Sequence, residues 1–409
     1  MPDVIVIGGG AAGLMAAGTA ALYGANVTLV EKNKRVARKV MITGKGRCNL
    51  TNNTDLNGLI SNVANGGRFL YSAFSAFSAE DTMNLFESLG VPLKTERGNR
   101  VFPQSDKAVD VVDALQKYAR AAKIINNEVS DIIIEANNAC GVILQNGEKL
   151  CCDKVIVATG GLSYSVTGST GDGYRFAQKA GHTVTELKGS LVPLEMHEGF
   201  CSVLQGLSLK NIAIAVHKEG TKKPVYTDFG ELVFTHYGLS GPVILSASAH
   251  LPDAESGNYT LSIDLKPALT EDMLDSRLLK DFAKYSNRDF INSLSDLLPK
   301  SLIPVIVSQS KIPPHKRVNE ITKEERLRLL SLLKNLKLHI TGKRPIEEAI
   351  ITSGGVKTSE INPGTMQSKL CEGLYFAGEV IDVDAYTGGF NLQIAFSTGY
   401  LAGKSSVEE

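Results

Sequence analysis

The sequence predicts an α/β protein in which both ends of the chain form one domain around a parallel sheet and the middle forms an insert. Three stretches carry this prediction: a glycine-rich strand–helix–strand pattern at 4–31, a strand and a glycine-opened helix at 374–403, and short alternating strands followed by helices at 190–336. Strands that alternate with helices are typical of parallel sheets. Runs of short alternating strands indicate a small barrel or sandwich instead.

The first 31 residues match a dinucleotide-binding strand–helix–strand unit. Four apolar residues (4–7) precede Gly8, Gly10 and Gly13, an Ala-rich helix follows, and a second apolar run ends at Glu31. In this motif the first glycine permits a tight turn, and the second lets the backbone approach a pyrophosphate. The third glycine lets the helix pack close to the strand.

The same unit predicts where a nucleotide binds. The N–H groups of Ala11 and Ala12 open the helix, where the helix dipole favours negative charge. Glu31 stands about 20 residues further on, where a carboxylate accepts hydrogen bonds from a ribose diol. Because strand, helix, second strand and acid occur in this order, we predict a nucleotide-binding domain of the Rossmann type.

The composition is that of a globular protein without strong charge. The chain has 409 residues, of which 43% are hydrophobic and 21% charged, and 43 Lys and Arg balance 43 Asp and Glu. This length predicts two or three domains, and zero net charge gives no long-range attraction to nucleic acid or to an anionic membrane. Residues 4–30 carry no charged side chain, but their glycines favour a buried unit over a signal or membrane-spanning segment. We expect a cytoplasmic protein with no membrane role.

Six cysteines are scattered along the chain, and the sequence contains no Cys-x-x-Cys pair. The cysteine spacing therefore predicts neither a zinc site nor a dithiol relay, and no metal is expected. Cys48 has no second cysteine within a few residues, so its thiol is interpreted as a packing group rather than a redox partner.

The C-terminal stretch favours FAD as the nucleotide. In large flavoproteins a Gly–acid pair near the C-terminus, here Gly378 and Glu379, contacts the ribityl and phosphate region. Gly388 and Gly389 then open a helix whose N-terminus is expected to point at the flavin pyrimidine end, where reduced flavin carries negative charge. The turn at 159–161 (Thr-Gly-Gly) ends a predicted strand and fits the backbone beside a flavin. A nicotinamide cofactor alone would not explain why the strand and helix at 374–403 return to the nucleotide-binding domain.

Six further stretches carry a more specific signal. They are VMITGKGRCNLTN (40–52), RVFPQSDK (100–107), STGDGYR (169–175), THYGLSGP (235–242), ITSGGV (351–356) and AYTGGFN (385–391). In this order, and across nearly the whole chain, they resemble the BaiN-type NAD(P)/FAD-dependent oxidoreductase family, which includes aminoacetone oxidase-like flavoproteins. The resemblance implies non-covalent FAD in a Rossmann-type domain built from both termini, with an inserted β-barrel and helical bundle.

The resemblance and the changes of sequence texture give the expected domain boundaries. The FAD-binding domain is expected at 1–189 and 353–409, the barrel at 190–268 and 337–352, and the helical segment at 269–336. Residues 313–317, Pro-Pro-His-Lys-Arg, break the helical segment into two or more helices. The glycine-rich run 168–173 is interpreted as the start of a helix on the substrate or flavin side.

The predicted cofactor contacts come from the glycine motif and from the resemblance. The resemblance implies that Lys32, Arg38 and Lys39 line the adenosine and phosphate side of the cofactor. It also implies that the loop 44–47 passes the flavin ring and that the backbone of Val129 meets adenine. The predicted contacts are Gly8, Gly10, Ala11, Ala12, Gly13, Glu31, Lys32, Arg38, Lys39, Gly44, Gly46, Arg47, Val129, Thr159, Gly160, Gly378, Glu379, Gly389, Asn391 and Leu392.

Glu379 departs from the related flavoproteins, which usually carry Asp at this position. With Asn391 and Leu392 it is expected at the flavin end, where its longer side chain needs a water or a shifted backbone to reach the ribityl oxygen. No catalytic residue is identified. His236 and Tyr237 are candidates for proton donors, although a pair that packs a hairpin of the insert is the favoured interpretation.

The favoured function is a FAD-dependent oxidoreductase that exchanges a hydride at flavin N5 with a small-molecule substrate. The resemblance implies NAD(P)H-linked reduction of a conjugated C=C bond, as in a steroid- or bile-acid-like enone. The alternative is oxygen-linked oxidation of a small amine such as aminoacetone. No second nucleotide fingerprint occurs in the sequence, so NAD(P)H is expected to dock transiently. The insert is expected to cover the flavin and form the substrate pocket.

Two other classes of function stay open. A flavin-dependent tRNA-modifying protein would need a basic groove, and residues 311–328 offer only a modest basic run among many acids. A FAD-binding sensor would need no substrate pocket. We favour a small-molecule substrate over nucleic acid, and the oligomeric state stays open.

Overall fold

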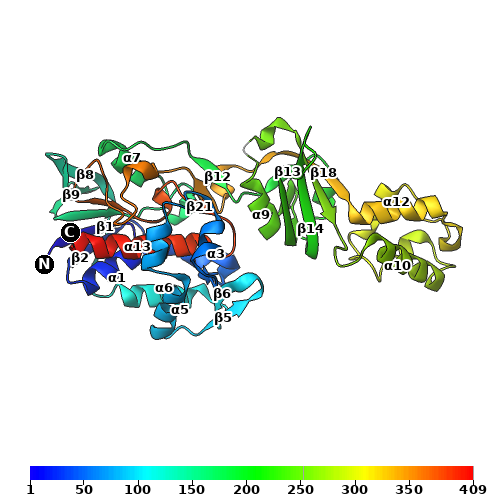
Figure 1. Ribbon diagram of the computed structural model, residues 1–409, viewed down its shortest axis with the longest axis horizontal. Coiled ribbons are helices and arrows are strands. Elements are labelled where there is room, and N and C mark those ends of the chain that lie inside the picture. The colour runs from blue at the N-terminus through cyan, green and yellow to red at the C-terminus, as the bar shows by residue number, and fades with distance from the viewer. Residues whose placement is uncertain (252, 409) are drawn as a thin grey trace. The chain divides into compact units, whose positions relative to one another are not determined.

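Figure 1 shows the computed structural model of the chain, which describes residues 1–251 and 253–408. The chain divides into two compact units. Unit 1 comprises residues 1–190 and 346–408, so both ends of the chain contribute to it, and unit 2 comprises Leu191–Pro345. This division confirms the predicted arrangement of one domain formed from both ends of the chain and an insert.

A five-stranded parallel sheet forms the centre of unit 1. Its strands are β20 (Leu374–Phe376), β11 (Lys154–Val157), β1 (Asp3–Ile7), β2 (Asn26–Glu31) and β7 (Lys123–Asn126), in this spatial order. Apart from the edge strand β7, the strands are mostly apolar and buried, as is typical of a parallel sheet covered on both faces. Strand β20 comes from the C-terminal part of the chain and extends the sheet that β1 begins.

Helices and smaller sheets complete unit 1. The helices are α1 (Ala11–Leu22), α2 (Arg38–Ile42), α3 (Leu56–Ser61), α4 (Tyr71–Ala76), α5 (Ala79–Ser88), α6 (Ala108–Tyr118), α7 (Asp172–Lys179) and α13 (Phe390–Glu408). The smaller sheets are formed by β10 (Lys149–Cys151), β9 (Asn138–Leu144) and β8 (Val129–Glu135), by β3 (Thr51–Asn52), β6 (Arg100–Pro103) and β5 (Leu93–Glu96), by β12 (Lys188–Ser190) and β19 (Ile351–Ser353), and by β21 (Asp384–Ala385) and β4 (Val63–Asn65).

Helix α13 packs directly on helix α1, so the two ends of the chain lie side by side (Figure 1). Their backbones approach so closely that the contact has no room for side chains. A Cβ atom on Gly399 would lie 2.5 Å from the carbonyl oxygen of Ala12, and one on Gly403 would lie 2.4 Å from that of Ala16. Glycines in α13 therefore set the distance between these helices.

The strands that flank the insert belong to unit 1. Strand β12 pairs with β19 in an antiparallel ladder that joins Lys188 to Ser353 and Ser190 to Ile351. Residues 346–352, which the sequence analysis assigned to the barrel, therefore group with unit 1, because this ladder holds them there.

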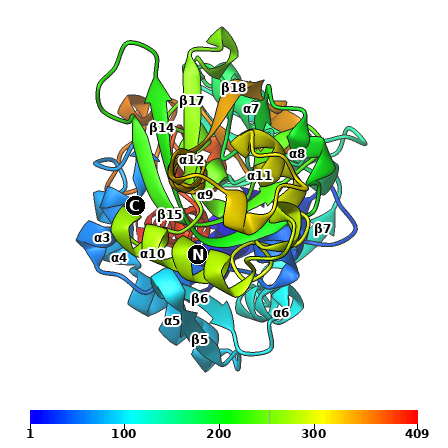
Figure 2. The same cartoon turned by 90° about the vertical axis from the view of Figure 1, so that its right-hand side faces the viewer.

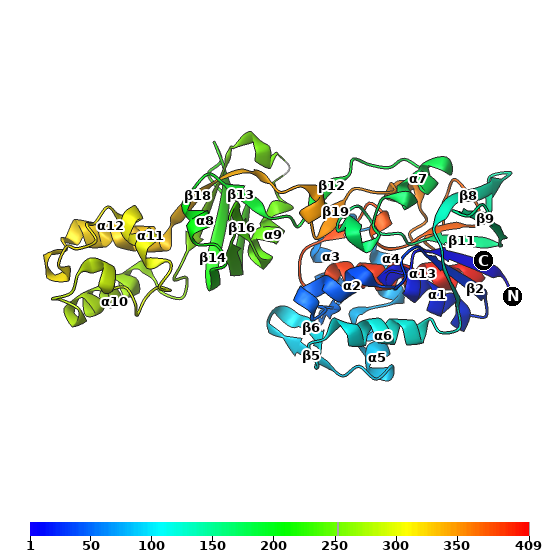
Figure 3. The same cartoon turned by 180° about the vertical axis from the view of Figure 1, so that it is seen from behind.

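One part of unit 2 is a closed six-stranded barrel, which confirms the predicted barrel. Its strands are β13 (Leu194–Met196), β16 (Gly238–Ser240), β15 (Tyr226–Phe234), β14 (Ser208–Lys218), β17 (Tyr259–Asp264) and β18 (Leu336–Lys343), in this spatial order. Burial alternates along β17, where Tyr259, Leu261 and Ile263 face the core. This alternation is the period of a strand with one buried face. Figure 3 shows the barrel strands from behind, with α8 (Phe200–Val203) and α9 (Pro242–Ser248) beside them.

The second part of unit 2 is helical, as predicted. It contains α10 (Glu271–Lys284), α11 (Ile303–Ser310) and α12 (Lys323–Lys334), which are labelled in Figure 2. Pro313 and Pro314 lie between α11 and α12, where the chain cannot stay helical. Helix α12 starts at a capping box, in which the Thr322 hydroxyl accepts from the N–H of Glu325 and the Glu325 carboxylate accepts from the N–H of Thr322. No described helix is long and apolar enough to cross a membrane.

Because Gly403 allows α13 to touch α1, we expect Gly403→Val to destabilise unit 1. The added side chain would meet the backbone of α1, which cannot move without separating the helices, and such overpacking costs about 1–3 kcal/mol. Thermal unfolding followed by circular dichroism should show a lower midpoint. Gly199→Ala is the control, since a Cβ there meets no atom within 4 Å. Equal midpoints for both variants would show that the contact tolerates a side chain.

Candidate nucleotide-binding site

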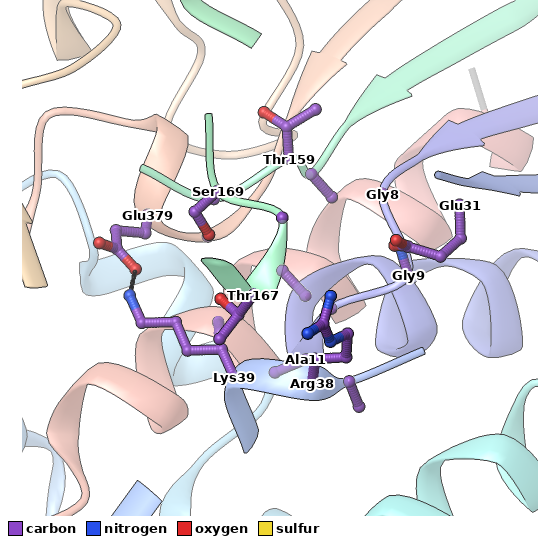
Figure 4. A pocket seen from close by; sticks show the side chains of 18 of the residues that line it. Gly8, Gly9, Ala11, Glu31, Arg38, Lys39, Thr159, Thr167, Ser169 and Glu379 are labelled. Carbon is purple, nitrogen blue, oxygen red and sulfur yellow. Dashed lines mark hydrogen bonds and ion pairs between the residues drawn. The ribbon is translucent and has the colours of Figure 1, made fainter. Parts of the chain in front are cut away.

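Unit 1 contains a cavity at the carboxyl ends of its parallel strands. Its empty volume is about 1320 Å³, including the solvent space at its open side. The lining comes from segments that are far apart in the sequence: 7–12 after β1, 30–40 at the end of β2, 158–160 after β11, and 377–379 after β20. Ligands of open α/β sheets bind at this edge, because the loops that follow the strands meet there. Figure 4 shows some of the side chains that line the cavity.

The N-terminus of α1 opens into this cavity without a cap. Gly10 occupies the N-cap position, no side chain caps the helix, and its first turn contains no acidic residue. A Cβ atom on Gly10 would meet no atom within 4 Å, so empty space lies directly in front of its backbone. The first N–H groups of a helix and its dipole attract an anion. This end of the cavity therefore has the geometry of an anion site.

Two other glycines of the motif bring β1 and α1 together. Gly8 has a φ of +101°, a backbone conformation that favours glycine, and a Cβ there would lie 2.7 Å from the carbonyl oxygen of Ala158. A Cβ on Gly13 would lie 1.8 Å from the carbonyl oxygen of Gly8. The tight turn and the close helix–strand contact that the sequence predicts at these positions are therefore present.

Glu31 places a buried carboxylate beside the anion site. Its Oε2 accepts a hydrogen bond from the Gly9 N–H at 2.7 Å. Its Oε1 accepts from the Asn33 N–H at 2.7 Å and from the Asn33 amide Nδ2 at 2.6 Å. The side chain is only 7% exposed and lines the cavity. Because three N–H donors fix the carboxylate at the end of β2, it can present its remaining lone pair to a ligand hydroxyl.

The segment 167–172 closes one side of the cavity against the end of β2. Asn33 Nδ2 donates to the Thr167 carbonyl oxygen at 3.2 Å, and Lys32 Nζ lies 2.6 Å from Asp172 Oδ2 and also bonds Thr170. Burial opposes ionisation of Asp172, but the hydrogen bonds from Lys32 and Thr170 outweigh it and hold the pKa of the carboxyl below its usual value. The glycine-rich run thus lies beside Lys32, and the lysine charge is matched by a carboxylate.

Lys39 and Glu379 form an ion pair in the cavity wall. Lys39 Nζ donates to Glu379 Oε2 at 2.6 Å and to Ser163 Oγ at 2.7 Å. Glu379 Oε1 accepts from Ser163 Oγ at 2.9 Å and from the Thr352 N–H at 2.8 Å. Figure 4 shows this pair across the cavity from Glu31. Lys39 was expected on the adenosine and phosphate side, whereas it lies beside Glu379, the residue expected at the flavin end.

Most of the predicted contact residues lie together in the lining of this cavity. They are Gly8, Gly10, Ala11, Ala12, Glu31, Lys32, Arg38, Lys39, Val129, Thr159, Gly160, Gly378, Glu379, Asn391 and Leu392. The Asn391 side chain bonds the Ala385 N–H at 2.9 Å and the Ala385 carbonyl oxygen at 2.7 Å, so it shapes the loop before α13.

Five predicted contacts lie outside the lining: Gly13, Gly44, Gly46, Arg47 and Gly389. Gly13 serves the helix–strand contact described above. Gly389 lets the start of α13 approach β3, because a Cβ there would lie 2.3 Å from the Thr51 carbonyl oxygen. Gly44 and Gly46 are exposed, in a loop where Gly44, Lys45 and Gly46 all have positive φ.

Arg47 is held by partners of its own rather than by the cavity. Its guanidinium bonds the carboxylates of Glu96 and Asp106 and lies 4.2 Å from the centre of the Phe102 ring. Hydrogen bonds from Arg47 to these two acids raise its pKa. The arginine therefore stabilises the β5–β6 sheet edge in this structure.

The remaining candidates from the sequence are not among the residues that line the cavity in unit 1. His236 and Tyr237 form the turn between β15 and β16 of unit 2, with ring centres 4.7 Å apart, and the Arg344 guanidinium lies 4.5 Å from the Tyr237 ring. Cys48 is fully buried, and burial raises the pKa of its thiol to about 12, which keeps the thiolate scarce at neutral pH. In the part of the chain that the structure describes, no group of three or more acidic, His or Cys side chains could hold a metal.

Several lining residues were not predicted. They include Asn33, Arg35, Val40, Thr43, Thr167, Ser169, Ile350, Ile351 and Val383. Arg35 belongs to the same basic run as Lys32 and Arg38, so the run as a whole could have indicated that Arg35 lines the cavity. Ile350 and Ile351 are apolar residues next to the insert, and no local pattern distinguishes them from core residues.

Comparisons with known proteins place the chain among nucleotide-binding enzymes. A family model described as HI0933-like protein Rossmann domain matches residues 2–405. The 3-dehydro-bile acid delta(4,6)-reductase of Clostridium scindens is 30% identical over 415 residues, which cover 100% of both chains. The ribosomal RNA dihydrouridine synthase of Escherichia coli is 31% identical over 412 residues, which cover 99% of both chains.

A solved structure shares the fold at low sequence identity. The 3-ketosteroid-delta4-(5alpha)-dehydrogenase of Rhodococcus jostii in complex with 4-androstene-3,17-dione aligns with a TM-score of 0.54 and 14% identity, over 100% of this chain and 97% of that chain. At this identity the likeness supports the architecture of the chain and says nothing of its substrate.

The open space in front of Gly10 allows a direct test of the cavity. Gly10 has extended backbone (φ −80°, ψ −168°), so valine fits the fold, while its side chain would fill the space in front of α1. We expect Gly10→Val to give a soluble, folded protein that retains no nucleotide. Circular dichroism would report the fold, and the visible spectrum and nucleotide content would report binding. A folded variant that retains nucleotide would contradict the anion site.

Glu31 supplies the second test of the cavity. Charge-assisted hydrogen bonds contribute about 1.5–3 kcal/mol, so we expect Glu31→Ala to weaken nucleotide retention by roughly 10- to 150-fold in a fluorescence titration. Glu87→Ala, an exposed acid on α5, is the matched control and should bind as the unchanged protein does. Equal affinities for the two variants would remove Glu31 from the site.

Proposed function

Because the chain belongs to the HI0933-like protein Rossmann family, we propose that it is a FAD-dependent oxidoreductase that reduces a C=C bond conjugated with a carbonyl, using NAD(P)H as electron donor. One observation carries the cofactor: an uncapped helix N-terminus and a fixed carboxylate stand side by side in a cavity that continues to the C-terminal segment. This arrangement fits a pyrophosphate, a ribose diol and a further bulky group in one ligand.

The cavity residues fit FAD in their chemistry. The uncapped N–H groups of Ala11 and Ala12 would hold the pyrophosphate, and the Glu31 carboxylate would accept from the adenosine ribose. The backbone of Val129 would meet adenine.

Apolar residues line the cavity next to the Lys39–Glu379 pair. Ile350, Ile351 and Leu392 line it, and the Ser163 and Thr352 contacts hold the charged pair within it. An apolar wall excludes water and suits a flat ring system, which we place at this end. Bound FAD supplies hydride exchange at its flavin N5, and the protein supplies position and electrostatics.

The reaction class is proposed from the chemistry that two relatives' names have in common. A 3-dehydro-bile acid delta(4,6)-reductase reduces ring C=C bonds of a ketone, and a dihydrouridine synthase forms dihydrouridine, which is uridine with one ring C=C bond reduced. In both substrates the reduced bond is conjugated with a carbonyl, which accepts electron density when a hydride adds to the far carbon. We therefore propose this bond type as the substrate feature.

For the substrate, we favour a small enone over RNA. The basic run that RNA binding would use is largely neutralised, since Lys316 pairs with Glu325, Arg317 with Asp289, and Arg326 with Asp275. A uridine-containing RNA stays the second candidate, because a relative of that activity is 31% identical over 99% of the chain. Oxidation of a small amine by oxygen is the third.

Anaerobic stopped-flow spectroscopy separates these candidates. We expect NADH or NADPH to bleach the flavin absorbance, and a steroid 3-keto-4-ene to restore it. Restoration only by a uridine-containing RNA, with salt-sensitive binding in a filter assay, would select the second candidate. Bleaching by aminoacetone but by neither nicotinamide would select the oxidase and contradict the proposal.

A further inference from the structure

The Lys39–Glu379 pair is assembled by parts of the chain that are far apart in the sequence. Lys39 comes from α2, Ser163 from the loop after β11, Thr352 from β19, and Glu379 from the turn after β20. The Thr352 hydroxyl in turn accepts from the Leu162 and Ser163 N–H groups at 2.8 and 3.1 Å. This network fixes both charges in the cavity wall.

The carboxylate is turned toward its protein partners. Glu379 Oε1 already accepts two hydrogen bonds and Oε2 accepts the bond from Lys39. A Cβ on Gly161 would lie 2.8 Å from Oε1, so the protein backbone also covers this atom. The expected role of Glu379, to accept from a ribityl hydroxyl, leaves these partners unexplained. They are explained if Glu379 holds the Lys39 ammonium.

The pair is only partly screened by solvent. The Lys39 side chain is 25% exposed and the Glu379 side chain 15% exposed, and both line the cavity. Of the three N–H bonds of the Lys39 ammonium, two go to Ser163 and Glu379. A charge with little water around it acts more strongly on a neighbouring ligand than a surface charge does.

We propose that Lys39 and Glu379 form a charge-balanced pair that sets the reduction potential of the bound cofactor, with Glu379 as the residue that positions and neutralises Lys39. The inference rests on one part of the proposed function, namely that FAD occupies this cavity with its ring system beside the Lys39–Glu379 pair. Reduced flavin carries negative charge at neutral pH, so an unbalanced cation in the wall favours reduction and an unbalanced anion opposes it.

Two near-isosteric variants test the sign of this effect. Glu379→Gln removes the negative counter-charge of the Lys39 cation. Lys39→Met removes the positive counter-charge of the Glu379 anion. We expect Glu379→Gln to raise the flavin midpoint potential and Lys39→Met to lower it. A roughly tenfold change in the two-electron equilibrium corresponds to about 30 mV for each variant.

Sulfite gives a second readout that needs no substrate. Sulfite adds to flavin N5 and leaves negative charge on the ring system, so its affinity should follow the potential. We expect a roughly tenfold smaller dissociation constant for Glu379→Gln and a roughly tenfold larger one for Lys39→Met. Both readouts are spectroscopic and independent of turnover.

The control is an ion pair of the same type outside the cavity. Lys179 and Asp131 lie 2.5 Å apart on the surface of unit 1, and neither lines the cavity. Lys179→Met and Asp131→Asn should leave the potential and the sulfite affinity unchanged. Parallel shifts in these controls would mean that the assay reports net charge of the protein rather than charge at the cofactor.

The outcomes separate this inference from the proposed function. Shifts of the same sign in the two cavity variants, unchanged potentials, or loss of FAD from both variants even with excess cofactor would overturn the inference and identify the pair as a structural clamp. An unchanged protein that binds no FAD would instead overturn the proposed function. If the two cavity variants shift the flavin midpoint potential in opposite directions but the protein does not reduce an enone, the inference about the charge pair stands and only the proposed substrate is rejected.

Discussion

The cavity depends on the contact between helix α13 and helix α1. Gly399 and Gly403 bring the backbone of α13 against the carbonyl groups of α1. Gly378 also lies close to α1, since a Cβ there would lie 2.8 Å from the Cβ of Ala12. These contacts hold the C-terminal segment 377–395 opposite the turn after β1. Without them the anion site at the start of α1 would have no facing wall, and the second half of the cavity would not form.

Charge is distributed in the cavity by pairing across long sequence distances. Lys32 is matched by Asp172, and Lys39 is matched by Glu379. Glu31 differs, because N–H donors rather than a cation hold its carboxylate. The cavity therefore keeps an uncapped helix N-terminus and a carboxylate with spare acceptor capacity at one end, and a neutral pair in an apolar wall at the other. Such a division suits a ligand with a polar, anionic half and a flat, aromatic half.

Features that depend on neighbouring residues were predicted from the sequence. The roles of Gly8 and Gly13 follow from local backbone geometry, and the structure shows both. The two-ended domain, the barrel and the helical segment also follow from periodicity and texture, and the class of enzyme, a FAD-dependent oxidoreductase, agrees with the family to which the chain belongs.

Features set by distant partners were not predicted. The position of the Lys39 side chain is set by Glu379, which lies 340 residues away in the chain. No local sequence pattern around Lys39 indicates this partner. Arg47 lies outside the cavity lining because Glu96 and Asp106 compete for its guanidinium, and because three consecutive residues with positive φ turn the 44–46 loop outward. Residues 346–352 belong to unit 1 rather than to the barrel. They follow the barrel strand β18 in the sequence, but β19 pairs with β12, which is part of unit 1.

The most direct test of whether this cavity holds FAD is the identity of the nucleotide that the purified protein retains. Heat release followed by chromatography and mass spectrometry, on protein incubated with equal amounts of FAD, FMN and NAD and then desalted, would give both identity and stoichiometry. We expect FAD at one molecule per chain and no retention of the other two. Stoichiometric FMN or NAD, or no retained nucleotide in a folded protein, would contradict this expectation.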